Sequence, residues 1–331
     1  MILVTGGNGL IGSFIIRELL QRGYKVKVFR RANSDLSLLA DVLSGVSFCE
    51  GDILDISSIH SALTDVEAIV HCAGFISFDP GDSDKIFKIN VEGTSNLVNA
   101  ALNYPIKKFI HLSSVAALGK NKKGGINEVT EDVKWEENDS GRYGKSKYLA
   151  ELEVYRGAAE GLNVAIVNPS VVIGPGNWSA GSTLLFKYIW EKKPFYTQGL
   201  INYVDVRDVA TGVVNLMEKD VSYERFILNG GAVDCQAMFA TIAKHFRKPA
   251  PKIKISSSSI KVLSFIEKLR SFITNSAPKI TRETASASIS KTIYINSKAK
   301  ETLSLSFKEL NESVEWTCGE IAKKYNLQIK N

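Results

Sequence analysis

The stretch that decides the fold stands at the start of the chain: Ile2-Leu3-Val4-Thr5-Gly6-Gly7-Asn8-Gly9-Leu10-Ile11-Gly12. A short apolar run, typical of a buried strand, ends in glycines spaced GxxGxxG, and a helical pattern follows. Glycine allows a sharp turn, a close approach of the backbone to a ligand, and tight packing of the helix on the strand. The helix N-terminus would then offer free N–H groups to phosphates. The loop therefore predicts a nucleotide-binding site; a tight glycine turn without a ligand is the alternative.

Strand-like runs and helical patterns alternate outward from this loop. The predicted strands span residues 2–4, 25–29, 46–49, 68–71, 108–112 and 164–168, and the predicted helices span 10–21, 57–63, 84–102 and 143–160. Such alternation indicates a parallel sheet covered on both faces. With right-handed crossovers, the predicted fold class is α/β, a Rossmann-type doubly wound parallel sheet with a smaller, mostly C-terminal domain.

The pattern becomes less regular after about residue 170. We expect residues 1–168 to form the nucleotide-binding Rossmann domain, with residues 200–220 returning to it. Residues 169–199 and 221–331 would form a substrate-binding domain. Within the second region, residues 260–273 show helical spacing interrupted by charges, which predicts an amphipathic helix packed against its own domain.

Composition and charge exclude several classes of protein. The chain has 331 residues, 44% of them hydrophobic, and a net charge of +6. Its basic runs lack interleaved aromatic residues, so nucleic acid is not an expected partner. We also expect no membrane span and no metal site, and the absence of a leader pattern favours the cytoplasm. Reduced, buried thiols are expected because no CxxC pair occurs among the four cysteines: Cys49, Cys72, Cys235 and Cys318.

A tyrosine and a lysine four residues apart on a helix form a candidate catalytic pair. The two side chains lie on one helix face, where a nearby ammonium lowers the pKa of the phenol. Tyrosine can then act as an acid toward a carbonyl. This spacing occurs at Tyr104/Lys108, Tyr143/Lys147, Tyr188/Lys192 and Tyr294/Lys298. Context selects Tyr143 and Lys147, because this pair alone opens a long helix that precedes a Rossmann strand.

These motifs together resemble the extended short-chain dehydrogenase/reductase family. Gly6, Gly9 and Gly12 match its glycine motif, and residues 90–94, Asn-Val-Glu-Gly-Thr, resemble its NVxGT helix. The resemblance implies that Tyr143 donates the proton and that Lys147 also binds the nicotinamide ribose. It further implies that a serine after the strand 108–112 orients the substrate oxygen. Alignment selects Ser114, with Ser113 as the alternative.

The same resemblance implies which residues contact the cofactor. Strand 25–29 ends in Arg30 and Arg31, where NAD-binding sites usually carry an acid, and no acid follows until Asp35. A guanidinium suits a 2′-phosphate, so we expect NADP (NADPH). By resemblance, Asp52 contacts the adenine. The expected cofactor-binding residues are Gly6, Asn8, Gly9, Leu10, Ile11, Gly12, Arg30, Arg31, Asp52, Ile53, Ala73, Gly74, Tyr143, Lys147 and Pro169.

The segment after the sixth strand separates branches of the family. Residues 169–175, Pro-Ser-Val-Val-Ile-Gly-Pro, look like dihydroflavonol 4-reductase-like members. Nucleotide-sugar epimerases typically carry R-x-x-N-x-Y-G-P here, and this chain has Asn168, Val171 and Ile173 at the Arg, Asn and Tyr positions. Dehydratases place an acid after the catalytic serine or threonine, where this chain has Val115. The resemblance implies an NADPH-dependent reductase of a small carbonyl substrate; the alternatives are an NAD(P)-dependent nucleotide-sugar epimerase and a non-catalytic NADP-binding sensor.

Three segments rich in aromatic residues and two apolar helices bear on the substrate and on the oligomeric state. Segments 75–78, 178–188 and 196–203 are rich in aromatic and aliphatic residues, which favours an apolar substrate; the alternative is that these residues form domain core. In many family members the helices matching 84–102 and 143–160 pair across a two-fold axis. Because both keep apolar residues on more than one face, we expect a homodimer. The apolar residues concerned are Val98, Leu149, Leu152 and Val154.

Overall fold

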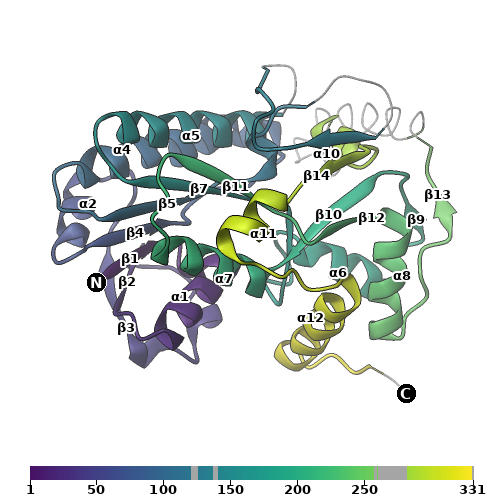
Figure 1. The fold of residues 1–331 in the computed structure, drawn as a ribbon. Helices are drawn as coiled ribbons and strands as arrows, with labels where there is room; N and C mark the ends of the chain where they lie inside the picture. Colours follow the sequence, from purple (N-terminus) through teal and green to yellow (C-terminus); the bar gives the residue numbers. More distant parts are fainter. Residues whose placement is uncertain (121–125, 137–140, 257–258, 260–281, 330–331) are drawn as a thin grey trace.

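The computed structural model describes residues 1–120, 126–136, 141–256, 259 and 282–329. The predicted helix at 260–273 lies outside these residues. In Figure 1 a large sheet with helices on both faces fills one side of the molecule, and a smaller group of strands and helices fills the other. Among the described residues, no helix is long and apolar enough to cross a membrane.

The large sheet has seven parallel strands in the order β11-β7-β5-β4-β1-β2-β3. It contains all six predicted strands and confirms the predicted fold class. Between β1 and β4 the strand order reverses direction, which is the point where ligands bind in sheets of this type. The strands are β1 (Ile2–Thr5), β2 (Val26–Arg30), β3 (Val46–Glu50), β4 (Ala68–His71), β5 (Lys108–Leu112), β7 (Val164–Pro169) and β11 (Glu224–Leu228).

Strand β11 was not among the predicted strands. It pairs with β7 at the edge of the large sheet, although the predicted boundaries placed residues 224–228 in the second domain. Its first half carries Glu224 and Arg225, so the run does not read as a continuous apolar strand. Pairing with a strand far back in the chain, rather than local pattern, defines it. The domain boundaries stay a prediction.

Helices cover both faces of the sheet, because the side chains along each strand point alternately to one face and to the other. On one face, α1 (Leu10–Gln21) and α7 (Val206–Glu218) pack on the side chains of Ile2 and Val4. On the other face lie α2 (Ile56–Leu63), α4 (Gly93–Ala101) and α5 (Arg142–Ala159), packed on Leu3 and its neighbours. Successive residues of one strand thus enter different cores.

The predicted helix 84–102 is interrupted. It consists of α3 (Ser83–Phe87), a π-helical turn (Lys88–Glu92) and α4. A π-turn inserts an extra residue into the helix, and such turns often occur at functional sites. Here the turn contains Asn90, a fully buried residue at 1% exposure.

Short 3-10 turns occur at Ser37–Leu39, Leu43–Gly45, Pro80–Asp82 and Val115–Ala117.

The smaller group is built on a three-stranded sheet, β12-β10-β8. Its strands are β8 (Val171–Ile173), β10 (Leu200–Asp205) and β12 (Gly231–Asp234), and its helices are α6 (Thr183–Trp190), α8 (Cys235–Phe246) and α12 (Leu310–Lys324). Trp178, Tyr188 and Tyr203 pack in the core that these elements share. For these three aromatic residues, the domain-core interpretation therefore fits the structure better than a pocket.

Short elements join segments that lie far apart in the chain. β9 (Phe195–Tyr196) pairs with β13 (Ile253–Lys254), and β6 (Asn127–Val129) pairs with β14 (Thr292–Tyr294). α11 (Ser297–Leu303) packs on β11 and α7, and α10 (Arg282–Ala287) lies near the start of α5. Figure 1 shows the C-terminal part of the chain returning across the large sheet through α11.

Candidate active site

The predicted site residues gather at one edge of the large sheet. The glycine loop follows β1, Asp52 follows β3, Ala73 follows β4 and Ser114 follows β5. Because all seven strands are parallel, these positions lie together at the carboxyl edge of the sheet. Tyr143 and Lys147, in the first two turns of α5, reach the same edge.

Two glycines make the loop after β1 possible. Gly6 has a φ of 64°, and a Cβ on it would lie 2.6 Å from the backbone nitrogen of Ala73. A Cβ on Gly12 would collide with the carbonyl oxygen of Gly6. The loop thus brings α1 against β1 and β4 at the point where the strand order reverses.

The start of α1 fits a dinucleotide pyrophosphate. Gly9 is its N-cap and supplies no side-chain acceptor, and the first turn carries no acidic residue. The N–H groups of this turn and the positive end of the helix dipole are therefore available to an anion. The predicted contacts Asn8, Leu10 and Ile11 lie in this turn or directly before it, and all three are partly exposed.

Arg30 and Arg31, predicted to face a 2′-phosphate, have different surroundings. Arg30 pairs with Glu50 at 2.7 Å and donates to the carbonyl of Ala32 at 2.8 Å, and its side chain is 15% exposed. Arg31 is exposed at the surface beyond the end of β2. The acid after them, Asp35, accepts hydrogen bonds from both the backbone and the hydroxyl of Ser37. Arg31 is thus the better placed of the two guanidiniums to meet a ligand.

The remaining predicted contacts line the same edge. The Asp52 carboxylate accepts from the backbone N–H of Leu54 at 3.0 Å, which orders the turn that also contains Ile53. Gly74 is exposed, and a Cβ on it would lie 3.9 Å from Lys147 Nζ. Pro169, at the end of β7, is buried.

Ser114, Tyr143 and Lys147 are brought together. The Ser114 side chain hydrogen-bonds with Tyr143, and Lys147 Nζ donates to the backbone carbonyl of Leu112 at 2.7 Å. Ser114 is partly exposed, whereas Ser113 is 5% exposed and lies beside Glu151. The geometry favours Ser114 over Ser113 as the serine beside the tyrosine.

The electrostatics of the pair differ from the sequence expectation. Burial raises the pKa of Tyr143 to about 12; a hydrogen bond with Ser114 lowers it, and the carboxylate of Glu283 raises it further. Burial also lowers the pKa of Lys147 to about 8, against the opposing effect of Glu151. The expected lowering of the tyrosine pKa by Lys147 is therefore wrong for this structure: among the described residues, the group that lowers the Tyr143 pKa is Ser114, not Lys147. At neutral pH the phenol is protonated and can donate.

A buried polar network behind the pair was not found from the sequence. Glu151, one turn after Lys147, is 1% exposed, accepts from Asn168 Nδ2 at 2.6 Å and pairs with Arg225 at 3.3 Å. Asn168 also donates to the backbone carbonyl of Ser114 at 2.9 Å. The network therefore connects α5 to the backbone that carries the serine. The spacing from Tyr143 and Lys147 along the same helix face was the available signal for Glu151.

Asn90 in the π-turn fixes the loop after β4. Its side-chain oxygen accepts from the N–H of Phe75 at 2.7 Å, and its Nδ2 donates to the carbonyl of Phe75 at 3.0 Å and to Ser146 Oγ at 2.9 Å. Asn90 thus connects this loop to α5.

In the same loop, Phe78 is 41% exposed and packs edge-on against Tyr143, with ring centroids 6.0 Å apart. Phe78 is the predicted pocket aromatic that meets the candidate catalytic side chain.

The other tyrosine–lysine pairs are engaged elsewhere. Tyr104 lies in a turn before β5, which contains Lys108. The Tyr188 hydroxyl donates to the carbonyl of Phe195 at 2.9 Å. Tyr294 belongs to β14, while Lys298 on α11 pairs with Glu224. Context along the sequence selected the pair that the structure places at the carboxyl edge.

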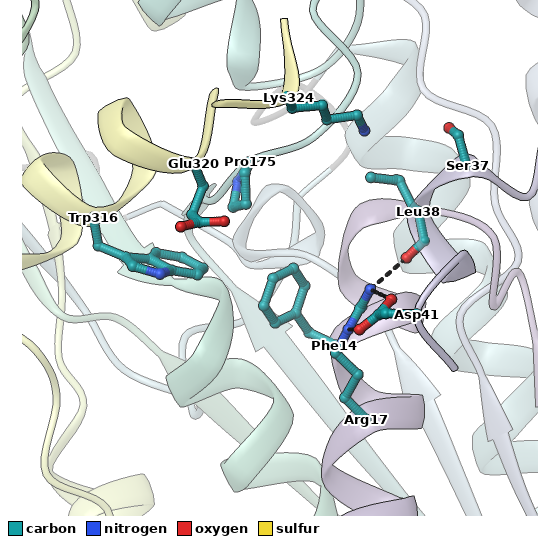
Figure 2. A pocket seen from close by; sticks show the side chains of 9 residues that line it. All are labelled: Phe14, Arg17, Ser37, Leu38, Asp41, Pro175, Trp316, Glu320 and Lys324. Atoms are coloured by element: carbon teal, nitrogen blue, oxygen red, sulfur yellow. Dashed lines mark hydrogen bonds and ion pairs between the residues drawn. The ribbon is translucent and has the colours of Figure 1, made fainter. Parts of the chain in front are cut away.

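A separate cavity of about 380 Å³ lies between α1 and α12 (Figure 2). Phe14 and Trp316 meet edge-on across it at 5.7 Å, and Arg17 is held by Asp41 at 2.9 Å. The predicted site residues do not line it. Its remaining lining residues are Ser37, Leu38, Pro175, Glu320 and Lys324.

A parallel sheet with a glycine loop at its switch point defines a Rossmann-type protein of the dinucleotide-binding class. Residues 2–229 match the model of the NAD dependent epimerase/dehydratase family. The chain belongs to this family, whose activities depend on NAD(P), and the resemblance to extended short-chain dehydrogenase/reductases is confirmed.

Three curated relatives cover most of the chain. Sterol demethylase protein B of Methylococcus capsulatus is 32% identical over 76% of this chain and 76% of its own. A Synechocystis protein whose name provisionally gives it as a dihydroflavonol 4-reductase is 29% identical over 95% and 93%. Cinnamoyl-CoA reductase 1 of rice, Oryza sativa subsp. japonica, is 30% identical over 70% and 71%. The similarity to the Synechocystis protein thus extends over both parts of the chain.

Solved structures share the whole fold. The protein gox2253 superimposes with a TM-score of 0.85 at 29% identity, covering 98% of both chains. UDP-glucuronic acid 4-epimerase from Bacillus cereus, solved in complex with NAD, gives a TM-score of 0.77 at 21% identity over 98% of this chain and 99% of its own. At that identity the epimerase shows the fold alone.

Proposed function

We propose that this protein is an NADPH-dependent reductase of a small carbonyl substrate, with Tyr143 as the proton donor. The observation that carries the proposal is the cluster of Ser114, Tyr143 and Lys147 at the carboxyl edge, beside the glycine loop. Similarity to proteins named as dihydroflavonol and cinnamoyl-CoA reductases supports a reductase.

The residues present would divide the work as follows. When bound, NADPH supplies the hydride. Ser114 would orient the substrate oxygen toward Tyr143, which would deliver its phenolic proton to that oxygen as negative charge develops there. The pKa of Tyr143, raised by burial to about 12, leaves the phenol protonated at neutral pH, which is the form that can donate. Lys147, next to Gly74, would hold the nicotinamide ribose.

The assignment of NADPH rests on the end of β2. Arg31 is exposed there, and the carboxylate of Asp35 is occupied by Ser37. A guanidinium and a phosphate form charge-assisted, paired hydrogen bonds, whereas NAD sites use a carboxylate for the ribose hydroxyls. The positive charge of Arg31 does not repel the ribose hydroxyls of NADH. The expected preference for NADPH therefore comes from attraction of the 2′-phosphate and not from exclusion of NADH.

A nucleotide-sugar epimerase is the second candidate. The match of residues 2–229 to the NAD dependent epimerase/dehydratase family, which includes epimerases by its description, favours it. Against it, Asn168 at the epimerase arginine position points inward, with its amide donating to Glu151 and to the Ser114 backbone. An epimerase would hold NAD tightly and regenerate it in each cycle, so the two candidates differ in cofactor and in net turnover.

The test is a screen of aldehydes and ketones with NADPH and NADH as reductants. We expect net oxidation of NADPH by an apolar or aromatic carbonyl compound. Tyr143→Phe should lower turnover by about 10²-fold or more, the scale of a positioned proton donor, while NADPH binding is retained. Tyr188→Phe is the matched control and should keep wild-type rates. NAD that co-purifies tightly, or full activity in Tyr143→Phe, would contradict the proposal.

A further inference from the structure

The helix that carries Tyr143 has no cap of its own. Its N-cap residue is Gly141, which has no side-chain acceptor, and its first turn has no acidic residue. The first N–H groups of a helix need partners, and the positive end of the helix dipole attracts a negative charge. Arg142 adds a further positive charge at this end.

Glu283, far away in the sequence, supplies the missing partner. The backbone N–H groups of Arg142 and Tyr143 both donate to its carboxylate. The carboxylate also lies so close to Gly141 that any Cβ at this position would collide with it. A glycine at the N-cap therefore leaves room for an acid that comes from another element, α10.

The segment after α10 is fixed on the small sheet. Gly199 N–H donates to the carbonyl of Ser288 at 3.1 Å, and Leu200 N–H donates to the carbonyl of Ser290 at 2.8 Å. Asn202 Nδ2 donates to the carbonyl of Thr292 at 2.7 Å. These bonds hold the chain beyond Glu283 against β10, so the position of the carboxylate is set by the tertiary structure.

We propose that Glu283 is a positioning residue for Tyr143: its carboxylate caps the helix α5 and places a negative charge at the turn that carries the phenol. The consequence for chemistry rests on the proposed function, in which Tyr143 donates its proton. A carboxylate near a phenol opposes loss of the phenolic proton, because the phenolate would be a second negative charge in its neighbourhood.

The charges around Glu283 agree with this role. Burial raises the pKa of Glu283, while the helix N–H groups of Arg142 and Tyr143 and the positive charges of Arg142 and Lys120 lower it. The Glu283 carboxylate in turn raises the pKa of Tyr143, in the same direction as burial. Removing the negative charge should therefore allow Tyr143 to ionise at lower pH.

The experiment measures ionisation of Tyr143 in the full-length protein. The chain has 11 tyrosines, so the tyrosinate absorbance of each protein is compared with that of its Tyr143→Phe counterpart. The variant Glu283→Gln keeps an oxygen that can accept from the helix N–H groups but removes the charge. We expect Tyr143 to ionise at lower pH in Glu283→Gln, with little change in Tm. Equal titration midpoints would overturn the proposal.

Two further variants separate charge from capping. Gly141→Ala places a Cβ where the carboxylate lies, so it should shift the Tyr143 titration in the same direction and also lower Tm. Glu301→Gln removes an exposed carboxylate on α11 and should change neither. A shift of equal size in Glu301→Gln would mean that net charge, not position, is responsible, and would also overturn the assignment.

Turnover distinguishes this inference from the proposed function. If the protein is a reductase, Glu283→Gln should raise the reverse rate, alcohol oxidation at a fixed pH below the Tyr143 pKa, by about threefold or more, because more phenolate is present. A shifted titration together with no turnover on any carbonyl compound would support Glu283 and overturn the reductase. Turnover on a carbonyl compound together with an unshifted Tyr143 titration would support the reductase and overturn the role of Glu283.

Discussion

At the scale of single residues, neighbours in the sequence have separate tasks. Arg30 stacks over Phe48, pairs with Glu50 and donates to backbone carbonyls of the following loop. Arg31 stands exposed beyond the same strand end. The first arginine thus shapes the loop, and the second is available to a ligand, a distinction that the dipeptide alone does not contain.

Arg31→Asp should therefore abolish or invert the preference for NADPH. The carboxylate would repel the 2′-phosphate and accept from ribose hydroxyls instead, and loss of one charge-assisted bond corresponds to about tenfold or more in affinity. Titration of NADPH and NADH into wild-type protein and variant measures it. Arg30→Ala is the comparison: because it releases the loop from Glu50, it should weaken both cofactors. Equal affinities of the wild type for the two cofactors would contradict the NADP assignment.

At the scale of elements, α5 gathers the candidate chemistry because one helix face meets the end of the sheet. Tyr143, Lys147 and Glu151 follow one another at intervals of four residues, and the helix directs them to Ser114, Leu112 and Asn168 respectively. Burial of Lys147 disfavours its charged form, and the buried carboxylate of Glu151 opposes that effect. The helix therefore carries both the titrating group and the group that keeps it charged.

Glu151→Gln should shift the alkaline limit of activity to lower pH. The pKa of Lys147 is about 8, so its positive charge is present below that pH and is lost as the pH rises through it. Without the Glu151 carboxylate the pKa falls further, and the loss begins at lower pH. The measurement is kcat/KM for carbonyl reduction against pH. The control is Glu153→Gln, on the partly exposed side of α5, which should keep the wild-type dependence of kcat/KM on pH. An unchanged pH dependence in Glu151→Gln would contradict the role of Glu151 in keeping Lys147 charged.

At the scale of the whole molecule, the expected homodimer depends on the outer surface of α4 and α5. The two helices do lie side by side (Figure 1). Two of the apolar residues that supported the prediction, Val98 and Val154, are 0% exposed, because they pack in the core beneath the helices. Leu152 is 43% exposed and Leu149 is partly exposed. The support from the sequence is thus reduced to these two leucines, and the dimer stays a prediction.

Sedimentation at micromolar concentration should show a dimer, and Leu152→Glu should convert it to a monomer. A buried charge without a partner at an interface opposes association, whereas the same side chain on a free surface is hydrated. The circular dichroism spectrum of the variant should remain that of the wild type, since Leu152 is not in the core. A wild-type protein that sediments as a monomer would contradict the predicted homodimer.

The sequence by itself determined the class of fold, six strands of the large sheet and the choice of Tyr143 with Lys147. These depend on local patterns, because apolar periodicity, glycine spacing and the four-residue helical interval are each contained in a short stretch of chain. Asn90 shows the limit of such patterns: its motif was recognised, but not the π-turn that directs its amide to Phe75 and Ser146.

Only the tertiary structure decided which distant groups meet. It added β11 beside β7, placed Arg225 against Glu151, and brought Glu283 to the first turn of α5. No sequence period or motif predicts these pairings. Each joins segments that are far apart in the chain and that meet only when the elements between them pack together. A polar side chain in such a position reads as an ordinary surface residue until the fold buries it, and burial is what gives its charge an effect on Tyr143 and Lys147.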